Sequence, residues 1–354
     1  MSLIVYAFAI LCIAATAIPI VKNDASWIRV FDFPRIQILI LSALVFLLLL
    51  IVESGFNSFS SLLLVFLGLS LALQASKIFP YTKIHTTQIL EADKKGTQFK
   101  VMCANVWQPN RNSKALMDLV YHENPDILLA VETNKWWENQ LQNLSGLYNN
   151  IISKPQENTY GMMLFTKFEV TKHEVKYITH DDVPSIHCRI QLDDNTTAEL
   201  HCIHPRPPVP SKAQGSSQRD AELVRIGRQI RDSSIPQIVC GDLNDVGWSY
   251  TSKLFRKISK LMDPRVGRGM FNTFHAKYFF LRFPLDHIFC SQHFKHVRMK
   301  RLPEWGSDHF PILAELEFTP AAKADHDPPD PDMNDKKAAG EELEEAKEES
   351  DKVH

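Results

Sequence analysis

The stretch Ile235-Pro236-Gln237-Ile238-Val239-Cys240-Gly241-Asp242-Leu243-Asn244-Asp245 does most to decide the fold of this chain. Its first half is largely apolar and predicts a buried strand, and its second half consists of residues that favour turns. A carboxylate and an amide, Asp242 and Asn244, are therefore expected where a buried strand passes into a loop. An ordinary turn could have the same composition, so the meaning of the stretch depends on the rest of the chain.

The first eighty residues form a separate apolar region. Residues 1–21 and 54–76 carry no charged side chain, and residues 36–52 are interrupted only by Gln37 and Ser42. Each stretch approaches the roughly 20 residues that cross a bilayer core. We predict an all-α membrane region of about three helices, over residues 3–21, 36–52 and 57–76. A cleaved signal peptide is the alternative for the first helix, although this helix lacks a basic n-region and two more apolar segments follow it.

Basic residues beside these helices predict the orientation. The first connector contains Lys22, Arg29 and Arg35, the second contains no Lys or Arg, and four Lys follow the third helix. By the positive-inside rule this pattern favours an integral protein of the cell inner membrane with its large domain in the cytoplasm. Six cysteines without paired or zinc-type spacing agree with a reducing compartment.

The remaining chain divides into a linker at 81–96, one large domain at 97–319 and a tail at 320–354. The tail holds five Lys/Arg against twelve Asp/Glu and almost no large apolar residue, which predicts an acidic disordered segment. In the large domain, helical spacing is clearest over 113–123 and 217–231. Short apolar runs predict strands at 99–106, 127–131, 161–165, 186–192, 198–204, 237–240, 285–290 and 310–318. Strands outnumber helices, so we expect packed sheets with helices outside.

Polar residues recur at the ends of these predicted strands. The set consists of an amide, a glutamate, a histidine, the Asp/Asn pair of the opening stretch, an aspartate that begins a strand, and a Ser-Asp-His run before the last strand. Its members are Asn105, Glu132, His204, Asp242, Asn244, Asp286 and Ser307-Asp308-His309. Six strand ends that supply such residues predict one oxygen-rich site.

The order Asn, Pro-Asp-x5-Glu, His, Gly-Asp-x-Asn, Asp-x-Ile-Phe, Ser-Asp-His resembles the endonuclease/exonuclease/phosphatase (DNase I-like) superfamily. The resemblance covers about residues 97–319, which it marks as the catalytic domain. It implies an α/β (α+β) fold, a four-layer αββα sandwich with two packed mixed sheets, and phosphoester hydrolysis that depends on a divalent metal, Mg²⁺ or Mn²⁺. With the apolar helices in front, the chain resembles a membrane-anchored, bacterial-type member.

The resemblance also implies roles for the strand-end residues. Glu132 is the expected metal-binding carboxylate, assisted by Asn105 and Asp308, because hard oxygen donors suit Mg²⁺. His309 is the expected base or phosphate contact, and Asp286 is expected to fix its tautomer and stabilise its charged form.

Three further side chains are expected to act on water and phosphate. Asp242 would align the attacking water, Asn244 would donate a hydrogen bond to the phosphate, and His204 would contact the scissile phosphate or help the leaving oxygen. Many relatives carry Tyr where this chain has His287. Neighbours on a strand alternate faces, so His287 is expected to point away from Asp286. Asp245 is interpreted as turn chemistry.

The substrate stays open at this level. Residues 253–301 contain twelve Lys/Arg against two Asp, with interleaved aromatic residues, which suggests an anion-facing surface that stacks on nucleobases or inserts into a bilayer. A nucleic-acid phosphodiester is the first expectation. A phospholipid or inositol-type headgroup is the alternative, and a catalytically silent membrane module is the third reading. The expected partners are the lipid bilayer and a phosphoester substrate, and no protein partner is predicted.

Overall fold

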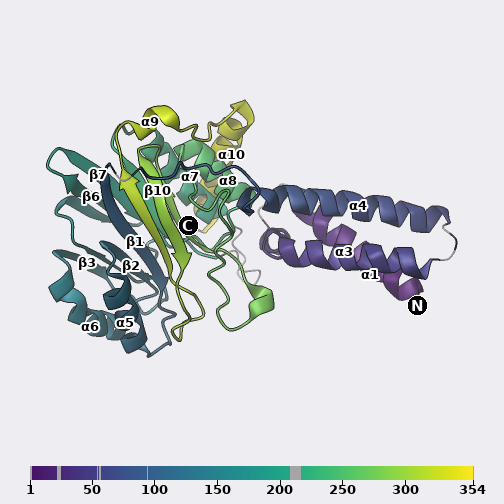
Figure 1. Ribbon diagram of the computed structural model, residues 1–354, viewed down its shortest axis with the longest axis horizontal. Coiled ribbons are helices and arrows are strands. Elements are labelled where there is room, and N and C mark those ends of the chain that lie inside the picture. Colours follow the sequence, from purple (N-terminus) through teal and green to yellow (C-terminus); the bar gives the residue numbers. More distant parts are fainter. Residues whose placement is uncertain are drawn as a thin grey trace.

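The computed structural model describes residues 2–21, 25–53, 55, 57–93, 95–207 and 217–353, and it shows a helical stalk joined to a large sandwich (Figure 1). The stalk contains three long apolar helices, α1 (Ser2–Ala17), α3 (Arg35–Val52) and α4 (Ser58–Ile78). Each is long and apolar enough to cross a membrane, α1 together with the three residues that follow it. The short elements α2 (Ser26–Arg29), η1 (Ile18–Ile20), η2 (Val30–Asp32) and η3 (Phe79–Tyr81) belong to the segments that connect the stalk helices to one another and to the sandwich.

The stalk helices pack through one face each and expose the others. Val5, Ala9 and Cys12 of α1 meet Val45 and Leu49 of α3 and a matching pair on α4, Leu63 and Leu67. Large apolar side chains cover the outer faces, which suits lipid rather than water. α1 runs toward the sandwich, α3 runs away from it and α4 returns (Figure 1).

The sandwich contains two mixed sheets. The first has the order β10-β11-β1-β2-β4-β3 and the second the order β5-β6-β7-β8-β9. Only β1 with β2 and β7 with β8 pair in parallel; the other neighbours are antiparallel. The strands are β1 (Thr97–Asn105), β2 (Ile127–Val131), β3 (Asn150–Lys154), β4 (Met162–Thr166), β5 (Val170–Lys176), β6 (Ser185–Asp193), β7 (Thr196–Cys202), β8 (Gln237–Asp242), β9 (Asp286–Cys290), β10 (Phe294–Arg301) and β11 (Ile312–Phe318).

Three apolar layers hold the sandwich together. Side chains from the inner faces of both sheets, such as Val101 and Ile186, form the central core. The outer face of the first sheet packs against α5 (Ser113–Glu123), α6 (Lys135–Leu141) and η4 (Gln142–Leu147). The outer face of the second sheet packs against α7 (Ser217–Arg231) and α8 (Tyr250–Ser259). The predicted four-layer αββα sandwich, preceded by three apolar helices, is confirmed.

The segment 81–96, which the sequence suggested as a linker, lies against the sandwich. The Tyr81 hydroxyl donates to the Gly247 carbonyl oxygen at 2.7 Å. Ile89 is fully buried in the central core, and the Ala92 amide donates to the His296 carbonyl oxygen on β10. The burial of Ile89 holds this segment on the sandwich, so the stalk is joined to the sandwich by a packed segment. We call residues 81–96 the docked strap.

The acidic C-terminal segment, expected to be disordered, contains α9 (Ala322–Asp325) and α10 (Met333–Val353). Ala339 of α10 packs with Val224 of α7 and Leu254 of α8. Lys257 pairs with Asp335 at 2.7 Å, and Lys260 pairs with Asp330 at 3.0 Å. The expectation of disorder was wrong because the acidic segment meets a basic surface on α8 and buries small apolar residues.

Candidate active site

The two parallel strand pairs bring the predicted site residues to one edge of the sandwich. β1 pairs with β2 so that Asn105 lies opposite Val131, and Glu132 follows directly. In the second sheet Cys202 lies opposite Cys240. His204 and Asp242 each follow two residues later, because parallel strands end at the same edge. Antiparallel pairing then sets Asp242 opposite Asp286.

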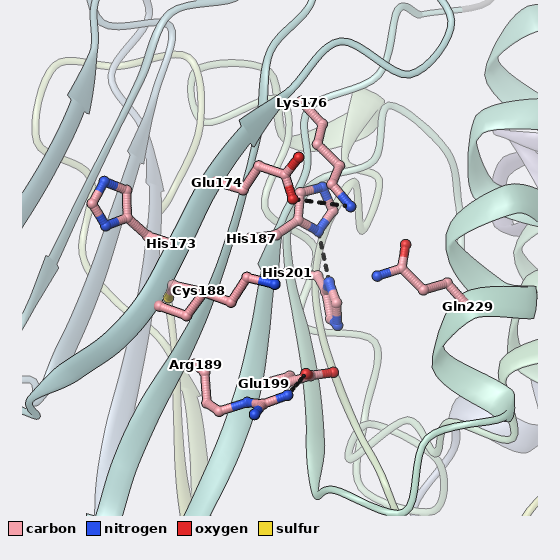
Figure 2. Close-up of a pocket in the computed structure, with 10 residues that line it drawn as sticks. His173, Glu174, Lys176, His187, Cys188, Arg189, Glu199, His201 and Gln229 are labelled. Carbon is pink, nitrogen blue, oxygen red and sulfur yellow. Dashed lines mark hydrogen bonds and ion pairs between the residues drawn. The ribbon is translucent and has the colours of Figure 1, made fainter.

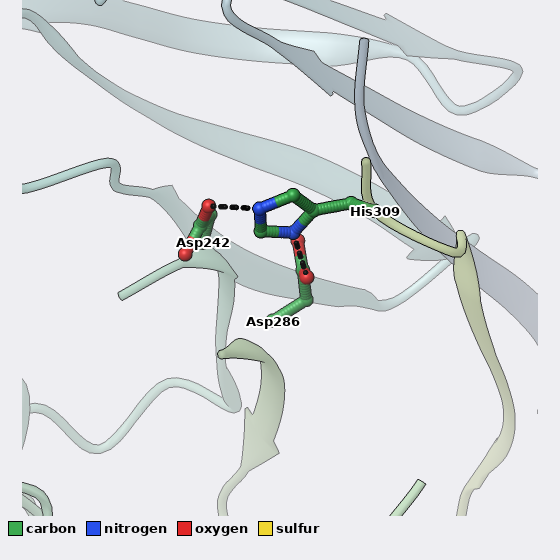
Figure 3. A group of neighbouring side chains, drawn as sticks. All are labelled: Asp242, Asp286 and His309. Carbon is green, nitrogen blue, oxygen red and sulfur yellow. Dashed lines mark hydrogen bonds and ion pairs between the residues drawn. The ribbon is translucent and has the colours of Figure 1, made fainter. Parts of the chain in front are cut away.

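His309 lies between two carboxylates (Figure 3). Its Nδ1 donates to Asp286 Oδ2 at 2.8 Å, and its Nε2 lies 3.6 Å from Asp242 Oδ2. Burial alone would lower the pKa of His309, but Asp286 and Asp242 outweigh it and raise this pKa to about 10. The imidazole is therefore held in its charged form at neutral pH, and the predicted pairing of His309 with Asp286 is present in the structure.

Asn105 connects the two halves of the site. Its Nδ2 donates to Glu132 Oε1 at 2.8 Å and to Asp242 Oδ2 at 3.0 Å, and its Oδ1 accepts from the Trp107 amide at 2.8 Å. In this orientation the amide nitrogen, rather than the oxygen, faces the two carboxylates. Asn105 thus acts here as a brace between Glu132 and Asp242.

Three site positions depend on an unusual backbone. Gly241 has φ +150°, and a Cβ there would lie 1.8 Å from the Ile203 carbonyl oxygen. Glu132 and Asn244 have φ 63° and 52°, in the left-handed region that side-chain-bearing residues seldom adopt. Such strain is typical of functional sites, where the surrounding structure enforces it.

The other predicted residues lie around this centre. The His204 Nε2 lies 3.9 Å from Asp242 Oδ2, and its buried Nδ1 has no hydrogen-bond partner in the part of the chain that the structure describes. The Asn244 side-chain amide donates to the Pro205 carbonyl oxygen at 3.0 Å. Asp308 is half-buried, and its backbone oxygen accepts from the Ala276 amide at 2.7 Å. His287, as expected, faces away from Asp286, toward the Asp245 carbonyl oxygen at 2.8 Å.

Two further residues shape the site: Ser307, which the sequence placed in the Ser-Asp-His run without a role, and Thr273, which it missed. Ser307 Oγ donates to the Asn105 carbonyl oxygen at 2.8 Å and accepts from the His309 amide at 3.0 Å. Thr273 Oγ1 accepts from the backbone amides of Leu285 and Asp286. The Ser-Asp-His run could have pointed to Ser307. No sequence signal marks Thr273.

Asp245 does more than form a turn. Its Oδ2 accepts from the hydroxyls of Ser249 and Ser252 at 2.6 and 3.3 Å, and its Oδ1 accepts from the Val246 amide. Ser249 is the N-cap of α8. Asp245 therefore fixes the connection between the site and α8.

The charges at this edge fit a divalent cation. The site has four carboxylates, those of Glu132, Asp242, Asp286 and Asp308. Burial lowers the pKa of His204, so His309 is the charged histidine of the site. Burial raises the pKa of Glu132 and of Asp242, and a neighbouring carboxylate raises each further. Donor atoms of Asp242, Asp286 and His309 lie within 4.8 Å of one another. Carboxylate oxygens are the ligands that Mg²⁺ prefers, and a divalent charge would relieve this excess.

A second polar pocket lies between the outer face of the second sheet and α7 (Figure 2). His187 and His201 share a hydrogen bond between their Nδ1 atoms at 2.7 Å, and their Nε2 atoms meet Ser185 Oγ and Gln237 Oε1 at 2.8 Å. Burial lowers the pKa of His187 to about 3, with His201 adding to the effect. All four ring nitrogens are engaged, which makes this pair a structural element.

Comparison with known proteins agrees with the fold. Truncated Caenorhabditis elegans TDP2 is 18% identical with a TM-score of 0.54, and the match covers 64% of this chain and 100% of that one. The human Nocturnin catalytic domain with bound sulfate anion is 18% identical with a TM-score of 0.52, covering 68% and 99%. An endonuclease/exonuclease/phosphatase family protein of Bacteroides thetaiotaomicron is 18% identical with a TM-score of 0.50, covering 63% and 96%. Identities at this level show the fold alone.

The sequence itself identifies the family. The chain matches none of the curated proteins. Residues 102–309, more than half of the chain, match the profile described as Endonuclease/Exonuclease/phosphatase family, and this range contains every strand-end residue of the site. The chain therefore belongs to the endonuclease/exonuclease/phosphatase family of metal-dependent phosphoester hydrolases.

Proposed function

We propose that this protein is a membrane-anchored hydrolase that uses Mg²⁺ or Mn²⁺ to cleave a phosphodiester at the bilayer surface. A phospholipid-type headgroup is the substrate that the geometry favours, ahead of the nucleic acid that the sequence suggested first. The observation that carries this choice is one loop, residues 274–283, which contacts both the stalk and the active site.

This aromatic loop contains η5 (Phe279–Leu281). It exposes 51% of Tyr278, 77% of Phe279 and 55% of Phe280. Gln37 Nε2 donates to the Phe280 carbonyl oxygen at 2.8 Å, so the loop lies beside the first turn of α3. Large exposed apolar side chains at the base of a membrane helix are typical of insertion into the interface.

The same loop forms a wall of the active site. The Phe274 ring lies 4.9 Å from the His309 ring. The Ala276 amide donates to the Asp308 carbonyl oxygen at 2.7 Å. A phosphoester held in the bilayer surface beside this loop would therefore lie close to His309.

The basic residues of 253–301 do not form the continuous anion-facing surface that the sequence suggested. Eight of the twelve pair with carboxylates in the described chain. Three of the others lie over aromatic rings that are close in sequence to the site residues Asn105 and His309: Lys277 lies over the Trp107 ring at 5.0 Å, and Arg282 and Arg301 lie over the Phe310 ring at 5.0 and 4.2 Å. Three cations suit a single headgroup better than a long polyanion, which needs many phosphate contacts.

The proposed chemistry assigns one task to each residue. Glu132 would hold the divalent cation together with Asp308, and Asn105 would assist by holding the Glu132 carboxylate in place; when bound, the cation neutralises phosphate charge. Asp242 would align the attacking water. His309, kept charged by Asp286, would contact the phosphate. His204, through the Nδ1 that has no hydrogen-bond partner among the described residues, and Asn244, once turned from Pro205, would complete the phosphate contacts.

The membrane arrangement is proposed from the same structure. Residues 1–80 would be the membrane region and 97–319 the catalytic domain, with 81–96 as the docked strap between them. Arg29 and Arg35 lie beside the sandwich residues Trp248 and Tyr250, and so does Lys77. Basic residues on this side favour a catalytic domain on the cytoplasmic face of the inner membrane.

The test uses the full chain in lipid nanodiscs with Mg²⁺ or Mn²⁺. Headgroup release from phospholipids, cleavage of plasmid DNA and RNA, and hydrolysis of bis-p-nitrophenyl phosphate are measured in parallel. The double variant Phe279→Ser/Phe280→Ser should lower lipid hydrolysis at least about thirtyfold and spare the soluble substrate, because each lost phenyl group removes about 1–2 kcal/mol of apolar contact and about 1.4 kcal/mol is a factor of ten. Tyr121→Ser, at an exposed aromatic position on α5, is the matched control. Cleavage of nucleic acid without lipid hydrolysis would establish the alternative.

A further inference from the structure

A cavity of about 280 Å³ lies where the stalk meets the sandwich. The stalk contributes Thr16 and Ile20 near the end of α1, Arg29 and Asp32 from the α1–α3 connection, Arg35 from the start of α3, and Leu73 and Lys77 from the end of α4. The sandwich contributes Trp248, Tyr250 and Lys253. We call this cavity the junction pocket. It is separate from the active site, none of whose proposed residues line it.

The junction pocket carries an excess of positive charge. Its lining holds four basic residues, Arg29, Arg35, Lys77 and Lys253, and one carboxylate, Asp32. Arg29 pairs with Asp220 at 3.3 Å, and Arg35 pairs with Asp32. Lys77 and Lys253 also line the pocket, and among the residues that the structure describes no ion pair joins either of them to a carboxylate.

The pKa of Lys253 shows that this excess of positive charge is unfavourable. Burial lowers its pKa to about 8, and the neighbouring Lys77, Arg256 and Arg35 lower it further against the effect of Asp32. A partly buried ammonium group without a counter-charge is unfavourable. An anion in the pocket would supply that counter-charge.

The apolar part of the lining indicates where the anion comes from. Ile20, Val21 and Leu73 line the pocket, and their side chains are 62%, 60% and 43% exposed on the outside of the stalk. Since apolar helix faces of this kind contact acyl chains, a ligand that reaches both the lysines and this wall has a phosphate and a hydrocarbon part. Tyr250, which is partly exposed, also lines the pocket, and tyrosine is typical of the headgroup level.

We propose that the junction pocket binds the headgroup of an anionic phospholipid from the leaflet next to the sandwich. Free inorganic phosphate shares the anion chemistry, but it would leave the apolar wall without a partner. The lipid is a bound ligand here and is not the substrate, so the proposal rests on the membrane arrangement proposed above but not on the proposed substrate.

The pocket is connected to the active site through residues 245–253. The Trp248 Nε1 donates to the Asp32 carbonyl oxygen at 2.7 Å. The Gly247 carbonyl oxygen accepts from the Tyr81 hydroxyl at 2.7 Å. This segment begins at Asp245, directly after Asp242 and Asn244, and Asp245 fixes it to the start of α8. A lipid in the pocket would therefore hold the loop that positions the proposed water-aligning carboxylate.

Native mass spectrometry of the full chain tests the binding. The chain is released from discs of phosphatidylcholine with one part in ten phosphatidylglycerol, and retained lipid is counted. The unaltered protein should retain a phosphatidylglycerol that excess phosphatidylcholine does not displace. Lys77→Gln/Lys253→Gln should weaken this retention at least tenfold. Lys114→Gln/Lys135→Gln, two exposed lysines on α5 and α6, is the charge-matched control and should behave as the unaltered protein.

Hydrolysis of bis-p-nitrophenyl phosphate in the same discs tests the connection. Phosphatidylglycerol should raise the rate several-fold over phosphatidylcholine alone in the unaltered protein, and it should have no effect in Lys77→Gln/Lys253→Gln. Equal retention of phosphatidylglycerol by the variant and the control would show that the junction pocket is not the site that binds this lipid. Displacement of the lipid by millimolar inorganic phosphate, with the same rate increase, would overturn the lipid assignment. The retention measurement remains decisive even if no substrate is hydrolysed.

Discussion

The variant Asp286→Asn would show how the charge on His309 is maintained. It keeps the size of the side chain and an oxygen that can accept from His309 Nδ1 at 2.8 Å, but it removes the negative charge. At an effective dielectric constant of about 20, a charge pair some 4 Å apart contributes about 4 kcal/mol, which is about three pKa units. The pKa of His309 should therefore fall from about 10 to about 7.

The assay is the pH profile of kcat/KM for bis-p-nitrophenyl phosphate at saturating Mg²⁺, measured on both proteins in the same discs. A bound cation lowers the pKa of His309 in both proteins, so the difference between their alkaline limbs is the informative quantity. In Asp286→Asn the alkaline limb should move to a pH about three units lower. At one pH unit above the new pKa, kcat/KM should therefore be about tenfold below its maximum. Asp118→Asn, which removes an exposed carboxylate on α5 away from the site, is the charge-matched control. An alkaline limb at the same pH in Asp286→Asn would refute the assigned role.

Three further predictions concern stability, measured by denaturant unfolding in detergent. Burial raises the pKa of Glu222 to about 7, so its ionisation removes stability as pH rises from about 4.5 to 7; Glu222→Gln should gain about 3 kcal/mol at pH 8 and nothing at pH 4. Burial lowers the pKa of His187 to about 3. Between pH 6.5 and 5 this histidine takes up a proton in the unfolded chain but not in the folded protein, so the free energy of unfolding should fall by about 2 kcal/mol. His187→Gln should not show this fall. Gly241→Ala should cost at least about 3 kcal/mol, since its Cβ meets the Ile203 carbonyl oxygen, whereas Gly146→Ala, with open space around it, should be neutral.

The sequence predicted the parts of the fold whose side chains follow a simple pattern. The helices 113–123 and 217–231 match α5 and α7 in their bounds, because apolar residues at helical spacing face a sheet. Three strands were missed. β5, with the sequence VTKHEVK, and β10, with FKHVRMKR, lie at sheet edges and carry charges toward solvent, and β3 is a short edge strand. Edge strands bury little, so their sequences lack a strong apolar signal.

The candidate site was predictable where a motif marks a strand end. Asn105, Glu132, Asp242, Asp286 and His309 meet because strand pairing forces their ends together. The orientation of the Asn105 amide, the anchoring roles of Ser307 and Asp245, and the contact of Thr273 depend on tertiary neighbours. The pairing of the basic residues in 253–301 also depends on distant carboxylates, such as Glu91 and Asp335, that no local pattern reveals.

The most direct test of the central claim is the metal dependence of hydrolysis at the His309 centre. The full chain in discs is treated with EDTA, titrated with Mg²⁺ or Mn²⁺, and assayed with bis-p-nitrophenyl phosphate beside His309→Ala and Glu132→Gln. We predict that turnover vanishes with EDTA and returns with metal. His309→Ala should lower kcat at least about a hundredfold, and Glu132→Gln should raise the metal concentration for half-maximal activity at least about tenfold. Turnover that survives EDTA, or that His309→Ala leaves unchanged, would contradict the assignment of this site.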